Sequence, residues 1–231
     1  MPSLELRYNL LLSPHPDDLV FSGFSALCEH SEKRAIVFFN VSRYTRWKVK
    51  SKLLVSGYRT LEDRIILGLF GVRVSFLFLE DTSLCNERPQ SVNLTELKAM
   101  LPSRILPRKI FCPLGIGGHS NHLLVRQSGI DLWHSWEKKP ELFFYEDLPY
   151  ATFDLRNSRY SLEGCLDDVK RFCGTLRIAW RPISASEMRQ KLLAGRAYAS
   201  QTNHTKLLAE HSRKLGKECS AEFAEKYFAP E

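Results

Sequence analysis

The chain has 231 residues, of which 44% are hydrophobic and 26% are charged, and its formal net charge is +7. This length fits one domain over residues 1–231, and the composition is typical of a soluble globular protein with a buried core. No apolar run approaches the roughly 18 to 20 residues of a membrane-spanning helix, so the sequence predicts no membrane span.

Apolar runs that predict strands alternate along the chain with segments of helical periodicity. We expect strands at 7–12, 34–41, 74–79, 109–112 and 142–145, and helices at 19–30, 53–70, 95–101 and 121–136. A late strand at 177–183 and helices at 185–193 and 205–215 follow. This order favours an α/β fold: a Rossmann-like, open, mostly parallel sheet flanked by helices, with a C-terminal strand/helix extension.

The cysteines and the N-terminus indicate a cellular compartment. Six cysteines are scattered without a C-x-x-C pair, which argues against a disulfide framework and against a structural zinc knuckle. The N-terminus lacks the basic flank and the apolar stretch of a signal peptide. We therefore expect reduced thiols and a cytoplasmic protein.

The positive charge is concentrated in two segments. Residues 170–217 contain eleven Lys and Arg against two Glu, and residues 43–52 contain five basic residues, two aromatic residues and no acid. A solvated basic face explains the longer segment, while a rim that attracts an anionic substrate is the functional alternative. Nucleic-acid binding is the weaker hypothesis, because no known binding motif accompanies the charge.

Two polar clusters follow predicted strands. S-P-H-P-D-D at 13–18 ends the first strand, and G-I-G-G-H-S-N-H at 115–122 ends the fourth. Ligands of open α/β sheets bind at this edge, so the two clusters are expected to meet. Each has an alternative explanation, since Asp17 or Asp18 could cap the next helix and His119 and His122 could lie on the surface. Together they supply the imidazoles and carboxylates of a hydrolytic zinc site.

These motifs resemble the PIG-L/LmbE-like family of zinc-dependent N-deacetylases. That family carries (A/S)-H-P-D-D or S-P-H-x-D-D first and H-P-D-H or H-x-D-H second. Further matches follow in the family's order: Y-R-T-L-E-D at 58–63 with Leu67-Gly68, Y-E-D-L-P-Y at 145–150, and Y-A-S-Q at 198–201. The resemblance spans residues 13–201 and implies an LmbE-like fold.

The resemblance also implies roles for five residues. His15, Asp18 and His122 would ligate one Zn²⁺ per chain, or another divalent transition metal. Asp17 would be the general base that takes a proton from the attacking water. His119 would stabilise the oxyanion or protonate the leaving amine. This division agrees with the chemistry, since a carboxylate beside a metal ligand is well placed to remove that proton.

Two positions depart from the family pattern. Leu19 replaces a common Glu after the paired aspartates, and Asn121 replaces the Asp between the two histidines. A carboxylate beside His119 would raise the pKa of its imidazole, whereas an amide does so less. Asn121 therefore predicts reduced or retuned activity without the loss of a ligand.

Four other residues are candidates for substrate binding together with Asn121: Arg59, Asp81, Glu146 and Asp147. Arg59 could hold hydroxyls or a phosphate, or form an exposed helical ion pair with Glu62 or Asp63. Asp81 could meet sugar hydroxyls or close a turn. Glu146 and Asp147 could orient His119 or a ligand, or cap the backbone.

The sequence thus predicts an enzyme that removes an N-acyl group, most often acetyl, from an amino sugar or a related small molecule. The surplus of basic residues suggests an anionic substrate. The alternatives are an amidase for a non-sugar amide, a non-catalytic family member that binds a ligand, and an anion- or nucleic-acid-binding protein in which the His/Asp cluster is incidental. Homo-oligomerisation is left open.

Overall fold

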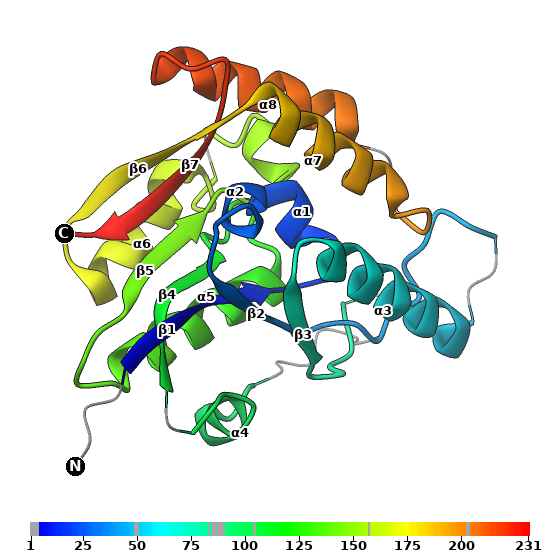
Figure 1. Cartoon of the computed structure of the whole chain (residues 1–231), viewed down its shortest axis with the longest axis horizontal. Coiled ribbons are helices and arrows are strands. Elements are labelled where there is room, and N and C mark those ends of the chain that lie inside the picture. The colour runs from blue at the N-terminus through cyan, green and yellow to red at the C-terminus, as the bar shows by residue number, and fades with distance from the viewer. Residues whose placement is uncertain are drawn as a thin grey trace.

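A seven-stranded sheet in the order β3-β2-β1-β4-β5-β7-β6 forms the centre of the molecule (Figure 1). The computed structural model describes residues 5–48, 51–82, 84, 91–103, 105–156, 158–201 and 204–231. The strands are β1 (Glu5–Ser13), β2 (Glu32–Val37), β3 (Val72–Phe76), β4 (Ile105–Pro113), β5 (Glu141–Tyr145), β6 (Leu176–Ile183) and β7 (Phe223–Pro230). The first five strands pair in parallel, whereas β7 pairs antiparallel with both β5 and β6.

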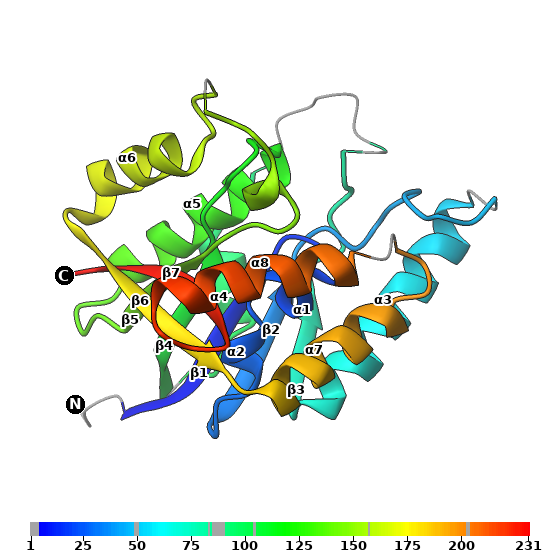
Figure 2. The ribbon, with the colours of Figure 1, turned by 90° about the horizontal axis from the view of Figure 1, so that it is seen from above.

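Helices cover both faces of this sheet, as the two perpendicular views show (Figures 1 and 2). The helices are α1 (Asp18–Ser22), α2 (Phe24–Leu27), α3 (Lys52–Leu69), α4 (Leu94–Ala99), α5 (Ser120–His134), α6 (Leu162–Cys173), α7 (Ala185–Ala197) and α8 (Thr205–Glu218). A 3-10 turn covers Tyr150–Thr152. The mostly parallel α/β fold predicted from the sequence is confirmed. No helix among the described residues is both long and apolar enough to cross a membrane.

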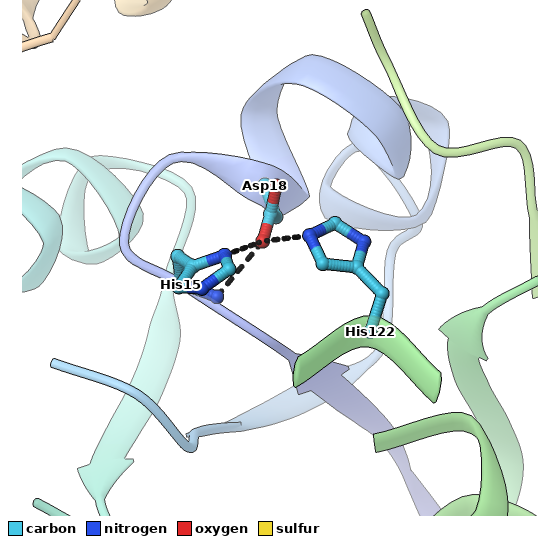
Figure 3. Close-up of side chains that lie close together, drawn as sticks. All are labelled: His15, Asp18 and His122. Carbon is cyan, nitrogen blue, oxygen red and sulfur yellow. Dashed lines mark hydrogen bonds and ion pairs between the residues drawn. The ribbon is translucent and has the colours of Figure 1, made fainter. Parts of the chain in front are cut away.

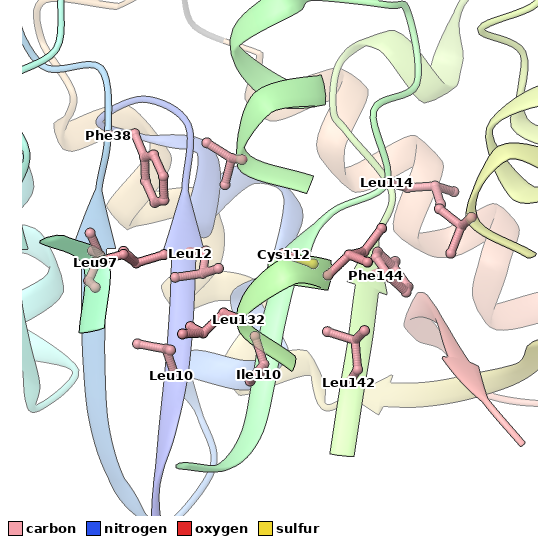
Figure 4. Packing of buried hydrophobic residues seen from close by; sticks show 14 of the residues in the cluster. Leu10, Leu12, Phe38, Leu97, Ile110, Cys112, Leu114, Leu132, Leu142 and Phe144 are labelled. Atoms are coloured by element: carbon pink, nitrogen blue, oxygen red, sulfur yellow. The ribbon is translucent and has the colours of Figure 1, made fainter. Parts of the chain in front are cut away.

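Side chains that alternate along the central strands divide the core into two layers. Leu10, Leu12 and Ile110 pack beneath α4, α5 and α6, in the layer that Figure 4 shows. Leu11 and Phe111 point to the other face, where α1, α2, α3 and α8 cover them. Because successive strand residues point to opposite faces, an apolar run buries both sides of the sheet.

One predicted helix differs from the structure, and the predicted C-terminal extension is incomplete. The helix expected at 19–30 is two short helices, α1 and α2, because Gly23 leaves the helical conformation between them. The Glu225 carboxylate accepts hydrogen bonds from the backbone N–H groups of Phe24 and Ser25, so a distant strand caps the start of α2. The predicted C-terminal strand and helices are confirmed as β6, α7 and α8. The structure adds α6 before them and β7 after them.

Candidate metal centre and active site

The loops that follow β1 and β4 border a cavity of about 350 Å³. The central strands β1 and β4 are neighbours, and the connection after β1 leads to β2 on one side while the connection after β4 leads to β5 on the other side. Such a switch point is where open α/β sheets bind ligands. His15, Asp17 and Asp18 line this cavity from the first loop and the start of α1, and His119 and His122 line it from the start of α5.

His15, Asp18 and His122 converge on one point (Figure 3). The Oδ2 atom of Asp18 lies 3.2 Å from Nδ1 of His15 and 3.6 Å from Nε2 of His122. One donor atom from each residue lies within 4.8 Å of the other two, and this trio is the candidate metal group found among the described residues. Two imidazoles and one carboxylate with an open fourth side match a catalytic zinc site.

Asp147 holds His122 in place from behind. Its Oδ1 atom lies 2.6 Å from Nδ1 of His122, and its Oδ2 atom accepts hydrogen bonds from the backbone N–H groups of Gly115 and Ile116 at 2.7 and 2.9 Å. Gly115 has a φ of 90°, which favours glycine, and this turn points its N–H at the carboxylate. With Nδ1 bound to Asp147, His122 presents the Nε2 lone pair to a metal.

The adjacent carboxylates of Asp17 and Asp18 are electrostatically different. Burial raises the pKa of Asp18, but the facing His122 and the hydrogen bond from His15 outweigh this and lower the pKa to about 2. Burial and the neighbouring charge of Asp18 raise the pKa of Asp17 well above its usual value. When the pKa values of two neighbouring carboxyl groups differ in this way, the group with the low pKa is suited to bind a metal and the group with the raised pKa is suited to proton transfer.

Asp17 occupies the N-cap position of α1, but its side chain makes no capping hydrogen bond. Its backbone is left-handed, with a φ of 97°, which Asp tolerates better than most residues. Asp17 as a whole is 8% exposed and lines the cavity. Helix capping therefore does not explain the paired aspartates.

His119 is the N-cap of α5, and its Nδ1 atom accepts a hydrogen bond from the backbone N–H of Asn121. The proton of the neutral ring is consequently on Nε2, which lies 3.4 Å from the hydroxyl of Thr82. Burial, reinforced by the nearby rings of His15 and His122, lowers the pKa of His119 to about 4. At neutral pH His119 is thus an uncharged hydrogen-bond donor facing the cavity.

Asn121 contacts a different histidine from the one that the sequence suggested. Its side-chain amide lies 2.8 Å from Nε2 of His15, on the side of that ring away from Asp18. The atom that faces this ring is the amide nitrogen of Asn121, which donates, so Nε2 of His15 accepts and the ring proton is on Nδ1, beside Asp18. When the amide turns to present its oxygen instead, the ring proton is held on Nε2 and Nδ1 is left to bind a metal. The side chain of Asn121 therefore contacts the candidate ligand His15, and only its backbone N–H contacts His119.

Arg59 lies in the cavity wall and is only 3% exposed. Its guanidinium donates to the hydroxyl of Ser42 and to the backbone oxygen of Pro16, and it lies 3.6 Å from the carboxylate of Asp81. The alternative of an exposed helical ion pair is therefore wrong. Asp81 also lines the cavity and is 3% exposed, so both predicted positions border the space that a substrate would fill.

Glu146, in contrast, is absent from the described residues that line the cavity. Its carboxylate binds Nε2 of His211 at 2.8 Å and the ammonium of Lys226 at 2.9 Å, which ties β5 to α8 and β7. The structure thus offers no support for its predicted role in substrate binding. Asp147, the neighbouring candidate, supports His122.

Sequence reasoning missed the apolar side of the cavity. Aromatic side chains from three segments contribute to it: Phe21, Tyr44, Tyr150 and Phe153. Leu148, Pro149, Gln201 and His204 also line it. The Y-E-D-L-P-Y and Y-A-S-Q stretches were a signal for some of these positions. No local pattern marks Tyr44, which lies in the basic segment at 43–52.

Comparisons with known proteins place the fold. No family model matches the chain, and no curated protein matches its sequence. Among solved structures, a deacetylase of the teicoplanin biosynthesis pathway superposes with a TM-score of 0.71 at 17% identity, over 96% of this chain and 97% of that one. The N,N'-diacetylchitobiose deacetylase of Pyrococcus horikoshii gives a TM-score of 0.71 at 15% identity, over 97% of this chain and 84% of that one.

The chain has the LmbE-like fold. The resemblance predicted from the motifs is thus confirmed for the architecture. The same fold also hosts other chemistry, because the 4-carboxy-2-hydroxymuconate hydratase of Pseudomonas putida superposes with a TM-score of 0.69 at 12% identity, over 97% of this chain and 96% of that one. The activity must therefore be argued from the site.

Proposed function

We propose that this chain is a zinc-dependent hydrolase of the LmbE/PIG-L family that removes an N-acyl group, most often acetyl, from an amino sugar or a related small molecule. The observation that carries the proposal is the convergence of His15, Asp18 and His122 beside the Asp17 carboxylate in one cavity. A bound zinc ion would lower the pKa of water and polarise the acyl oxygen.

Asp17 and His119 have separate tasks in this scheme. Asp17, whose pKa is raised, accepts the proton of the attacking water and returns it to the leaving amine. His119, uncharged at neutral pH, donates a hydrogen bond from Nε2 to the acyl oxygen as negative charge develops there. The sequence left open whether His119 is an acid or an oxyanion donor, and its lowered pKa favours the oxyanion donor.

The walls of the cavity favour an uncharged sugar over an anionic one. Arg59 is the one Lys or Arg among the described residues that line the cavity, and Asp81 faces its guanidinium. Aromatic rings such as Tyr44 and Phe153, each 52% exposed, offer faces on which a sugar ring packs. The name of the N,N'-diacetylchitobiose deacetylase, which has the same fold, supports a sugar-linked amide. Activity that is much higher on a phosphorylated sugar than on its neutral counterpart would refute this preference.

Metal analysis combined with a deacetylation assay tests the proposal. We expect about one zinc per purified chain, and release of acetate from N-acetylated sugars. The double variant His15→Ala, His122→Ala should lose both the zinc and the activity, whereas His30→Ala, at an exposed histidine that does not line the cavity, should keep both. Absence of metal after zinc is added would refute the hydrolase. Metal binding without turnover on amino-sugar or other amides would favour a non-catalytic, ligand-binding member of the family.

A further inference from the structure

The outward face of α3 is apolar although it faces solvent. Six large side chains on this helix are between 40% and 82% exposed: Leu53, Leu54, Tyr58, Leu61, Ile65 and Leu69. Arg64 is the one charged residue among the exposed positions from 53 to 69. On α8, by comparison, Lys206, Arg213 and Lys214 face solvent. Monomeric proteins rarely expose a continuous apolar strip of this kind.

Two glycines lie on the same face as Leu61. Gly57 and Gly68 are exposed, and a Cβ atom added to either would meet no other atom within 4 Å. The fold of one chain therefore does not need glycine at these positions. Each nevertheless costs the helix about 1 kcal/mol relative to alanine. Glycines on a helix surface allow another helix to approach closely, which suggests that this face has a partner.

We propose that the outward face of α3 binds the same face of a second copy of this chain, with the two helices antiparallel and the twofold axis at Leu61. In this register Ile65 lies over the partner's Gly57, and Leu54 lies over the partner's Gly68. Leu53 packs against the partner's Leu69. Large side chains on each helix thus meet the notches of the other, as a self-complementary twofold interface requires.

The charges on and near this face agree with a second copy. In the same register Arg64 meets the partner's Tyr58, whose ring and hydroxyl suit a guanidinium. The helix begins at the exposed Lys52, and an 18-residue helix is about 27 Å long. An antiparallel pair therefore keeps the two Lys52 side chains about three Debye lengths apart at physiological salt, while Trp47, whose ring lies 4.5 Å from that of Tyr58, borders the face from the preceding loop. A helix that lies on a membrane carries Lys and Arg along a solvated polar face. The face of α3 opposite its apolar strip is instead buried in the protein and includes Arg59 and Asp63.

The area of the face is sufficient for a stable dimer. If a whole large side chain presents on the order of 150–200 Å², the six exposed side chains offer about 600 Å² per copy. Two copies can then bury up to about 1,200 Å², which reaches the roughly 1,000 Å² expected of a biological interface. Figures 1 and 2 show α3 at the edge of the molecule, with α7 beside it. The exposure of its six large side chains shows that this face is open to a partner.

Sedimentation velocity on the full chain at several concentrations tests the interface. We expect the wild type to sediment at twice its mass of 26.7 kDa. Leu61→Arg should raise the dissociation constant about 100-fold or more, because it buries unpaired charge at the axis. Gly57→Leu should also disrupt the dimer, since it fills a notch at a position where an added Cβ meets no atom within 4 Å. Leu193→Arg, at a 64% exposed leucine on α7, is the matched control and should remain a dimer.

Cross-linking tests the register. Leu61→Cys should form a disulfide-linked dimer under mild oxidation, because residue 61 faces itself across the axis, whereas Leu193→Cys should not. A monomeric wild type, or a Leu61→Arg variant that stays dimeric, would overturn the proposal. So would a monomer that binds anionic phospholipid vesicles through Leu61, since a membrane would then be what covers the face. None of these outcomes depends on the hydrolase activity.

Discussion

The carboxylate of Asp147 lies 2.6 Å from Nδ1 of His122 and also accepts two backbone hydrogen bonds from Gly115 and Ile116. One side chain thus joins the glycine turn after β4 to a candidate metal ligand on α5. Buried carboxylates behind ligating histidines fix the ring and increase its basicity. Asp147 is fully buried, so its role is to position His122.

Asp147→Asn should therefore weaken zinc binding by about 10- to 100-fold. An amide cannot accept hydrogen bonds on both sides, so either His122 or the two backbone N–H groups would lose an acceptor. Competition with a zinc-binding dye measures the change. Asp131→Asn, at an exposed position on α5, is the control and should bind zinc like the wild type. Equal zinc affinity in both variants would show that Asp147 does not support the ligand.

Asp17→Asn separates the base from the ligands. We expect it to retain zinc and to lower kcat by about 10²- to 10⁴-fold, because the amide cannot accept the proton of the attacking water. Asp18→Asn should lose zinc, since its carboxylate lies between the two candidate histidines. Metal content and kcat are measured on the same preparations. If Asp17→Asn were the variant that emptied the site, the assignment of the two roles would be wrong.

The sequence predicted the fold well because apolar runs and helical periodicity reflect burial directly. It did not locate β7, which enters the sheet between β5 and β6 although it is last in the chain. Strand order at the C-terminus depends on how α7 and α8 pack, which local patterns do not encode. The interruption at Gly23 likewise depends on Glu225, about 200 residues away.

The site was predictable to the extent that strand ends meet at one edge. That rule brought His15, Asp17 and Asp18 near His119 and His122. The finer contacts depend on rotamers and loop backbone. The sequence could not show that the Asn121 side chain would contact His15, or that Glu146 would bind His211 and Lys226. Tyr44 enters the cavity from a loop whose conformation no periodicity determines.

Asn121→Asp tests the contact with His15. A carboxylate at this position would accept a proton on Nε2, which the amide nitrogen that faces this atom cannot do, and would make Nδ1 a better ligand. We expect zinc affinity to rise about 10-fold and Asn121→Leu to lower it. Zinc titrations of the three proteins compare these effects. Unchanged affinity in both variants would show that position 121 acts only through its backbone bond to His119.

The pH dependence of stability should report on Asp63, a buried residue of α3. Its carboxylate accepts hydrogen bonds from the Tyr198 hydroxyl and from the backbone N–H of Asp17, yet burial raises its pKa from 3.8 to about 7. Between these two values the folded chain keeps a proton that the unfolded chain has lost. The free energy of unfolding contributed by Asp63 therefore falls as pH rises from about 4 to 7.

Asp63→Asn removes this dependence, because its amide oxygen can still accept from Tyr198 but carries no charge at any pH. The variant should match the wild type near pH 4 and exceed its free energy of unfolding by on the order of 2–4 kcal/mol above pH 7. Denaturant unfolding at several pH values measures the difference, with Asp131→Asn as the exposed control. A difference that does not grow with pH would mean that Asp63 is already ionised in the folded chain, stabilised by its neighbour Arg59.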